Sequence, residues 1–154
     1  MNAKKASIRA RKNPRKINPG WFTGKVSMTE MSGIIGSRGH NIYHVSFEMG
    51  SRTKLHVHDG DQILYVTKGK GSLETFSKKG KGKEFFGIKK TQRTPLTQGD
   101  MVFIPRGTFH THGSTDKKGI FSHIAFNIIA AKGGKYTTTW YESDFASLAT
   151  TIIK

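Results

Sequence analysis

The sequence of 154 residues contains no cysteine, and this absence excludes disulfide bonds, thiolate metal ligands and a cysteine nucleophile. Any metal ion must therefore be held by histidine, carboxylate or amide side chains. Long apolar runs are also missing, because no stretch approaches the roughly 18 apolar residues that a membrane helix needs. The first residues contain no apolar segment of the secretory type. We therefore expect a soluble cytoplasmic protein that makes no contact with a membrane.

Acidic residues are scarce, since 10 Asp and Glu stand against 26 Lys and Arg, and the formal net charge is +16. Two segments supply most of this charge: residues 1–16 hold seven basic and no acidic side chains, and residues 78–93 hold seven basic and one acidic. Such clusters attract nucleic acids or anionic surfaces, although solvated tails and loops carry similar charge. We expect residues 1–17 to form a flexible basic arm, for which non-specific nucleic-acid contact is one role, and residues 78–93 to form a basic loop.

Beyond the arm, the sequence breaks into short runs rich in Val, Ile, Phe, Tyr and Thr, separated by Gly, Asp, Asn and Pro. Ten such runs are found, at residues 24–29, 41–48, 53–57, 62–67, 71–76, 84–89, 101–104, 108–112, 121–129 and 136–141. This spacing predicts an all-β fold, an antiparallel barrel or sandwich, with residues 18–154 as a single domain. Residues 142–149 are expected to form a short C-terminal helix, capped by Ser143 or Asp144. The segment Asp59-Gly60-Asp61 is predicted to be a hairpin connection.

Five of the seven histidines lie in three strand-like segments. Strand geometry places His56 and His58 on one face, about 6 to 7 Å apart, where two imidazoles can converge on one ion if a neighbouring strand supplies a third ligand. Gln62 begins the next strand, and His110 opens a later one, so both are candidate ligands. A lone His-x-His pair is a weak signal, and ordinary packing is the alternative. His112 is expected to pack or to support a ligand.

The order and spacing of two segments strengthen the metal hypothesis. They read Gly50-x5-His56-x-His58-x3-Gln62-x6-Gly69 and Gly99-x5-Pro105-x-Gly107-x2-His110. Together they resemble the paired motifs of the cupin superfamily, whose small jelly-roll barrels hold a divalent metal with two His and a Glu from the first motif and a His from the second. Gln62 stands where Glu is usual, and Ser114 stands where the second motif usually ends in Asn.

A set of three His and one Gln is similar to that of the manganese-dependent cupin hydroxynitrile lyases. The resemblance therefore implies His56, His58, Gln62 and His110 as ligands of manganese, while iron, nickel, copper and zinc are also compatible with such donors. Further local similarity lies in residues 21–24, 52–53, 62–67, 110–113 and 122–125. In those lyases a His in the segment similar to residues 122–125 is the acid/base, which implies His123 as the catalytic residue.

Strand alternation places His123 and Asn127 on one face. Asn127, Thr53 and either Tyr43 or His44 are expected to supply hydrogen bonds to substrate, and Tyr43 is preferred. The first hypothesis is a lyase acting on a small organic substrate, because neutral ligands leave the charge of a divalent ion uncancelled and so favour polarisation of a substrate oxygen. A cupin dioxygenase that uses Fe or Mn is the second. The third is a non-catalytic cupin that senses a ligand or metal and contacts nucleic acid through its arm. The resemblance also implies a homodimer.

Overall fold

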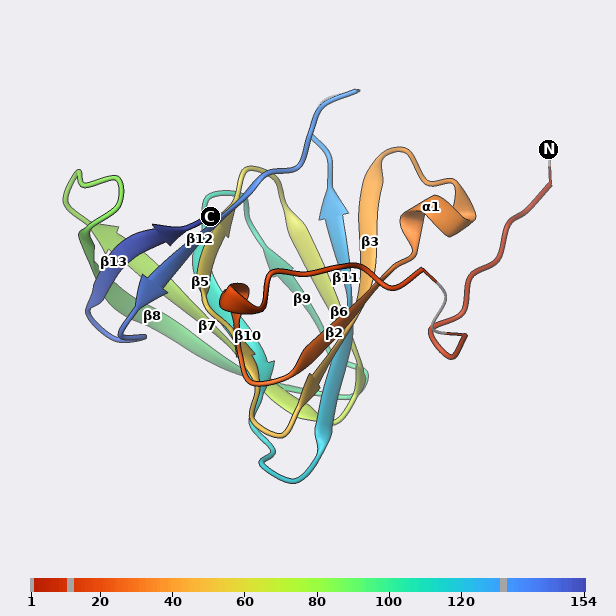
Figure 1. Ribbon diagram of the computed structural model, residues 1–154, viewed down its shortest axis with the longest axis horizontal. Helices are drawn as coiled ribbons and strands as arrows, with labels where there is room; N and C mark the ends of the chain where they lie inside the picture. The colour runs from red at the N-terminus through yellow and green to blue at the C-terminus, as the bar shows by residue number, and fades with distance from the viewer. Residues whose placement is uncertain (1, 11–12, 131–132) are drawn as a thin grey trace.

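The computed structural model describes residues 2–10, 13–130 and 133–154, and its regular structure consists almost entirely of antiparallel strands (Figure 1). Within these ranges the only helical elements are η1 (Pro19–Trp21) and α1 (Ser32–Ile35). The left-handed Gly36 (φ 71°) ends α1. No helix in the described part of the chain is long and apolar enough to cross a membrane. The predicted all-β class is confirmed.

Two sheets form the fold and enclose its interior. The smaller has the strand order β2-β3-β11-β6-β9, with bounds β2 (Val26–Glu30), β3 (His40–Glu48), β11 (Ile120–Ile128), β6 (Gln62–Lys68) and β9 (Met101–Ile104). The larger has the order β1-β4-β10-β5-β12-β13-β8-β7, and β10 also pairs with β7. Its bounds are β1 (Phe22–Thr23), β4 (Arg52–Thr53), β10 (Phe109–Ser114), β5 (Leu55–His58), β12 (Thr138–Ser143), β13 (Leu148–Ile153), β8 (Phe86–Thr97) and β7 (Lys70–Lys79).

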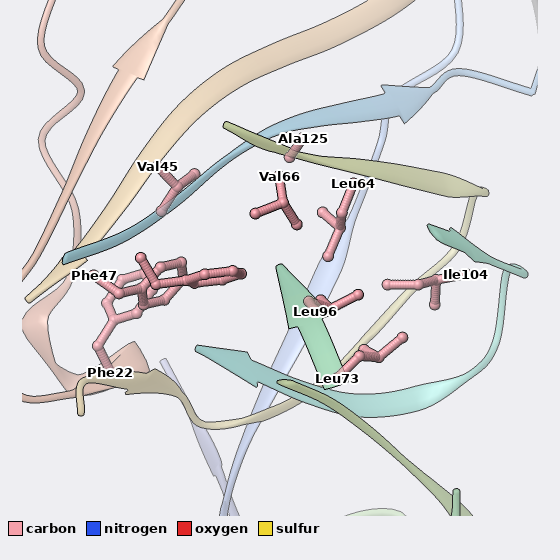
Figure 2. Close-up of a cluster of buried hydrophobic side chains, with 10 residues drawn as sticks. Phe22, Val45, Phe47, Leu64, Val66, Leu73, Leu96, Ile104 and Ala125 are labelled. Carbon is pink, nitrogen blue, oxygen red and sulfur yellow. The ribbon is translucent and has the colours of Figure 1, made fainter. Parts of the chain in front are cut away.

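The main hydrophobic core lies between the two sheets (Figure 2). Its buried members come from alternate positions of several strands, as the two-residue period of a strand requires. They are Phe22, Val45, Phe47, Leu64, Val66, Leu73, Leu96, Ile104, Phe121 and Ala125. Because these side chains point inward, the residues between them face outward. Some inward-facing positions of β3, β5, β6, β10 and β11 carry polar side chains, and these are available for a polar site.

A second apolar cluster packs on the other face of the larger sheet. It contains Leu55, Phe76, Phe86, Ile88, Tyr141 and Ala149. Leu55 is fully buried there, whereas the next residue on β5, His56, belongs to the barrel interior. Strand β5 therefore has an apolar face held by the second cluster and a histidine face turned toward the interior, as its alternating sequence predicts.

The predicted C-terminal helix is wrong, because residues 142–149 form the end of β12, the turn at residues 144–147 and the start of β13. The Asp144 carboxylate (Oδ1) accepts hydrogen bonds from the backbone N–H groups of Ala146, Ser147 and Leu148 at 2.7–2.9 Å. Phe145 adopts a positive φ of 59°. An aspartate at a helix start binds N–H groups in the same way, so the local signal was ambiguous. Pairing of Leu148 and Ala149 with β8 decides the outcome.

Two connections also differ from the expectation. Asp59-Gly60-Asp61 joins β5 to β6, which belong to different sheets, so it is an inter-sheet crossing and not a hairpin. Turn residues specify a bend but not the partner of each strand. The basic segment 78–93 is mostly strand, because β7 runs to Lys79 and β8 begins at Phe86. Five of its seven cations lie on the strands, and Lys81 and Lys83 lie in the connection between them. The Lys78 ammonium lies 4.6 Å from the centre of the Phe86 ring.

The end of the N-terminal arm lies beside β2. Pro14 forms an isolated bridge with Thr29, and the backbone N–H of Arg15 donates to the Met28 carbonyl at 2.9 Å. The Glu30 N–H donates in turn to the carbonyl of Asn13 at 3.1 Å. Met1, Arg11 and Lys12 of the arm lie outside the described residues. Flexibility of the arm stays a prediction.

Candidate metal centre

A cavity of about 200 Å³ opens between the sheets and contains most of the histidines. His56 and His58 from β5, Gln62 from β6, His112 from β10 and His123 from β11 all line it. Pockets for drug-sized ligands have volumes of roughly 300–1,000 Å³. This cavity is smaller and fits a small organic molecule.

Three imidazoles converge on one side of the cavity. Strand β10 runs antiparallel to β5 with His110 directly opposite His56, and the centres of their rings lie 4.1 Å apart. The ring of His58 lies 5.0 Å from that of His56 and 5.1 Å from that of His110. The fold thus brings together the three candidate histidines, although fully buried His110 lies behind the cavity lining.

Each of these rings has one nitrogen engaged with an oxygen. The Nδ1 atoms of His56 and His110 lie 2.8 and 2.7 Å from the carbonyl oxygens of Lys54 and Thr108. A carbonyl only accepts, so both Nδ1 atoms carry the proton and both Nε2 atoms keep a free lone pair. His58 Nδ1 contacts the Thr138 hydroxyl at 2.8 Å. Metal-binding histidines are oriented by such contacts.

The atoms left over are those that a cation needs. His58 Nε2, His110 Nε2 and Gln62 Oε1 are buried without a hydrogen-bond partner among the described residues. The amide nitrogen of Gln62 donates to Asn127 Oδ1 at 2.8 Å, which fixes the amide and leaves its oxygen free. Buried acceptors without a donor are costly, and a bound cation would satisfy all of them at once. The donor set therefore fits a divalent transition metal.

His112, which was expected to pack or to support a ligand, lies close enough to the cluster to be a ligand itself. Ligand atoms of His56, His110 and His112 all lie within 4.8 Å of one another, so these three also form a potential metal triad. His112 Nδ1, however, lies 3.1 Å from Nε2 of His123 and is engaged there. The two triads share His56 and His110 and differ in whether His58 or His112 is the third member.

Burial keeps the cluster uncharged. It lowers the pKa of His58 to about 2, an effect to which the neighbouring His110 adds, and it lowers the pKa of His110 to about 4. The pKa of His123 falls to about 3, first through burial and then through His44. His56 and His112 are shifted in the same direction, again mainly by burial. Neutral imidazoles are the form that binds metal.

The remaining predicted residues also lie at the cavity. Thr53 and Tyr43 line it together with Asn127. Thr53 uses its hydroxyl oxygen to accept the backbone N–H of His112 at 3.0 Å, so it positions β10 as well as facing the cavity. Sequence reasoning missed Thr138, because nothing in a lone threonine on β12 indicates that it will meet His58. It also missed Arg15 as a lining residue, because the arm has no strand pattern.

Comparison with known proteins adds a family to this geometry. No curated protein matches the chain significantly. Among solved structures, a cupin-like protein from Thermotoga maritima is 30% identical over 86% of this chain and 87% of its own, with a TM-score of 0.61. A predicted oxalate decarboxylase from the same organism is 22% identical over 83% and 98%, with a TM-score of 0.55.

The manganese-containing oxalate decarboxylase of Bacillus subtilis is 17% identical over 85% of this chain and 30% of its own, with a TM-score of 0.59. At these lower identities the likeness concerns the fold alone. The sequence profile described as cupin matches residues 21–150, which is most of the chain and includes every candidate ligand. With the two-sheet barrel and the histidine cluster inside it, this match establishes that the chain belongs to the cupin family.

Proposed function

We propose that this cupin is a metal-dependent lyase that acts on a small organic molecule inside the barrel. The ligands are His56, His58 and His110, with the amide oxygen of Gln62 as the fourth. Two observations carry the proposal: the Nδ1 contacts that orient the rings of His56 and His110, and the buried atoms His58 Nε2, His110 Nε2 and Gln62 Oε1, which lack a partner among the described residues. Manganese is the proposed ion, because the ligand set is similar to that of manganese-dependent lyases and a structural neighbour holds Mn(II).

A divalent ion held by four neutral ligands keeps its full charge and supplies Lewis-acid polarisation of a substrate oxygen. The residues of the chain supply the proton transfer. His112 and His123 form a hydrogen-bonded pair at 3.1 Å, and both line the cavity. Burial keeps both rings neutral at rest, which leaves His123 able to accept a proton but makes it a weak base. In this proposal His123 accepts the proton of a substrate hydroxyl, and the hydrogen bond to His112 stabilises the resulting imidazolium and so offsets the effect of burial.

Other residues orient the reactants. Asn127 accepts a hydrogen bond from Gln62, Thr53 accepts one from the backbone of His112, and Tyr43 lines the same cavity. The walls next to the histidines are aromatic, since Trp140 stacks on the His56 ring with 4.3 Å between the ring centres. This environment excludes water from the proton-transfer pair and strengthens electrostatic interactions within it.

Metal content of purified variants tests the ligand assignment. We expect His56→Ala, His58→Ala and His110→Ala to lose bound metal, while His123→Ala retains it and loses activity. His40→Ala is the control, because His40 is exposed at the start of β3. Full metal occupancy in His110→Ala contradicts the assignment. Loss of metal in His112→Ala, with retention in His58→Ala, identifies the alternative triad.

Cleavage of 2-hydroxypropanenitrile to acetaldehyde and hydrogen cyanide tests the reaction class. In this step the hydroxyl proton passes to His123, the carbon–carbon bond to the nitrile breaks, and the released cyanide takes up a proton. We expect the metal-loaded protein to catalyse it equally well with and without oxygen. Activity only in the presence of oxygen supports a dioxygenase and contradicts the lyase.

A further inference from the structure

The charge of the cavity wall is unusually one-sided. Among the described residues that line the cavity none is acidic. Arg15 is the one arginine or lysine among them. It comes from the basic arm, which precedes the cupin match at residues 21–150. A cavity with one cation and no acid attracts organic anions and repels organic cations.

Both the backbone and the side chain hold Arg15 at this position. Its N–H donates to the Met28 carbonyl at 2.9 Å, next to the bridge between Pro14 and Thr29. Its guanidinium carbon lies 4.7 Å from the centre of the Tyr43 ring, a cation–π contact. Met28 and Tyr43 themselves line the cavity. Figure 1 shows the arm running across the front of the barrel toward η1.

The guanidinium has no carboxylate partner within the described residues. None of the four ion pairs found there includes Arg15. Glu30 lies on the neighbouring β2, but its carboxylate accepts hydrogen bonds from Asn13 Nδ2 at 3.0 Å, from the backbone N–H of Gly33 at 2.9 Å and from the hydroxyl of Ser32. Arg15 is exposed and retains its donors for a ligand.

We propose that Arg15 binds the carboxylate of a small hydroxylated organic acid in the cavity, and so determines the substrate class of the enzyme. This inference rests on the proposed function, since it takes the cavity as the substrate site. A planar guanidinium forms two parallel hydrogen bonds with a carboxylate, which gives both affinity and orientation. With the acid group held at Arg15, the hydroxylated end of the molecule is directed into the cavity toward the histidines.

The two tryptophans of the chain provide a direct binding signal. Trp21 and Trp140 both line the cavity and stack with 5.1 Å between ring centres, and the chain has no other tryptophan. Titration with 2-hydroxypropanoate and with its neutral counterpart 2-hydroxypropanamide, followed by tryptophan fluorescence, measures the contribution of the carboxylate. We expect the wild-type protein to bind the acid at least tenfold more tightly than the amide. Absence of saturable binding of the acid overturns the proposal.

Three variants separate Arg15 from the general charge of the arm. Arg15→Gln should weaken binding of 2-hydroxypropanoate at least tenfold and leave binding of the amide within twofold. Lys16→Gln, which removes the same charge from the adjacent exposed position, should leave both unchanged. The affinity of Arg15→Lys for 2-hydroxypropanoate should lie between those of the wild type and Arg15→Gln. An ammonium keeps the positive charge but lacks the two parallel N–H donors of a guanidinium. Unchanged acid binding in Arg15→Gln, or equal loss in Lys16→Gln, overturns the proposal.

The outcome is independent of the metal assignment. Fluorescence titrations are made on the protein as purified, whose metal content is measured in parallel. A protein without metal that still discriminates acid from amide through Arg15 contradicts the proposed lyase and supports the anion site. If the metal-loaded protein binds 2-hydroxypropanoate equally well with and without Arg15, the result overturns the anion site and does not contradict the proposed metal site.

Discussion

The rings of His56 and His110 are oriented by the same local device. In each case Nδ1 donates to the carbonyl two residues earlier, at Lys54 and at Thr108, each of which directly precedes the strand. The direction of each ring is therefore set within three consecutive residues and does not depend on distant packing. His58 differs, because its Nδ1 depends on Thr138 of a strand that is 80 positions away in the sequence.

This difference predicts the effect of a small change at Thr138. Thr138→Val keeps the shape of the side chain and removes the hydroxyl that orients His58, so we expect about 10- to 100-fold weaker binding of Mn²⁺. Thr139→Val is the matched control, since Thr139 is the next residue on β12 and does not line the cavity. Competition with a fluorescent chelator measures both affinities. Equal affinities in Thr138→Val and the wild type argue that His58 is not a ligand.

Strand β5 connects the candidate metal centre to the stability of the fold. Its histidines face the cavity, while Leu55 and Val57 pack in the second apolar cluster. The β12–β13 hairpin pairs with β5 on one side and with β8 on the other, and it brings Tyr141 and Ala149 into that cluster. The ligand strand is therefore supported from behind by residues that take no part in the site.

Two adjacent phenylalanines test this support: Phe85, directly before β8, and Phe86, its first residue. Phe86 is 3% exposed and contacts the rings of Phe109 and Tyr141, whereas Phe85 is 63% exposed. Phe86→Ala should lower the free energy of unfolding by about 3–5 kcal/mol, because it removes a buried aromatic ring and leaves a cavity. Phe85→Ala should change it by less than about 0.5 kcal/mol. Urea denaturation measures both, and similar losses in the two variants contradict the assigned packing.

Over the whole molecule, the charge and the site are separate features of the chain. Two segments contribute most of the net charge of +16, and both lie outside the candidate ligand set. The barrel interior is instead a neutral environment of imidazole, amide and hydroxyl groups, to which the arm contributes Arg15 alone among the described lining residues. Apart from Arg15, interior chemistry and surface charge can therefore be varied independently by mutation.

The buried histidines predict how the stability of the metal-free protein depends on pH. Burial lowers the pKa of His110 to about 4 and of His123 to about 3, below the usual value of 6.5. The unfolded chain then binds more protons than the folded chain below pH 6.5. The free energy of unfolding should be highest above that pH. It should decrease toward pH 4, by up to about 1.4 kcal/mol per pH unit for each such histidine.

Urea denaturation of chelator-treated protein at pH 7.5, 6, 5 and 4 measures this dependence. In the single variant His123→Gln the free energy of unfolding should decrease less steeply with falling pH, because one of the buried titrating groups is gone. A free energy of unfolding that stays constant from pH 7.5 to pH 4 contradicts the neutral, buried state of these rings.

Strand alternation and motif spacing are local properties, and they sufficed for the β class, the interior face of β5 and the grouping of His56, His58, Gln62 and His110 as one candidate site. Pairing between distant strands is not local. Asp144 carries a helix-cap signal, yet β8 draws the following residues into a hairpin. The contact of Thr138 with His58, the approach of His112 to the cluster and the place of Arg15 at the cavity depend on segments that meet only after folding, and no local pattern of the chain specifies them.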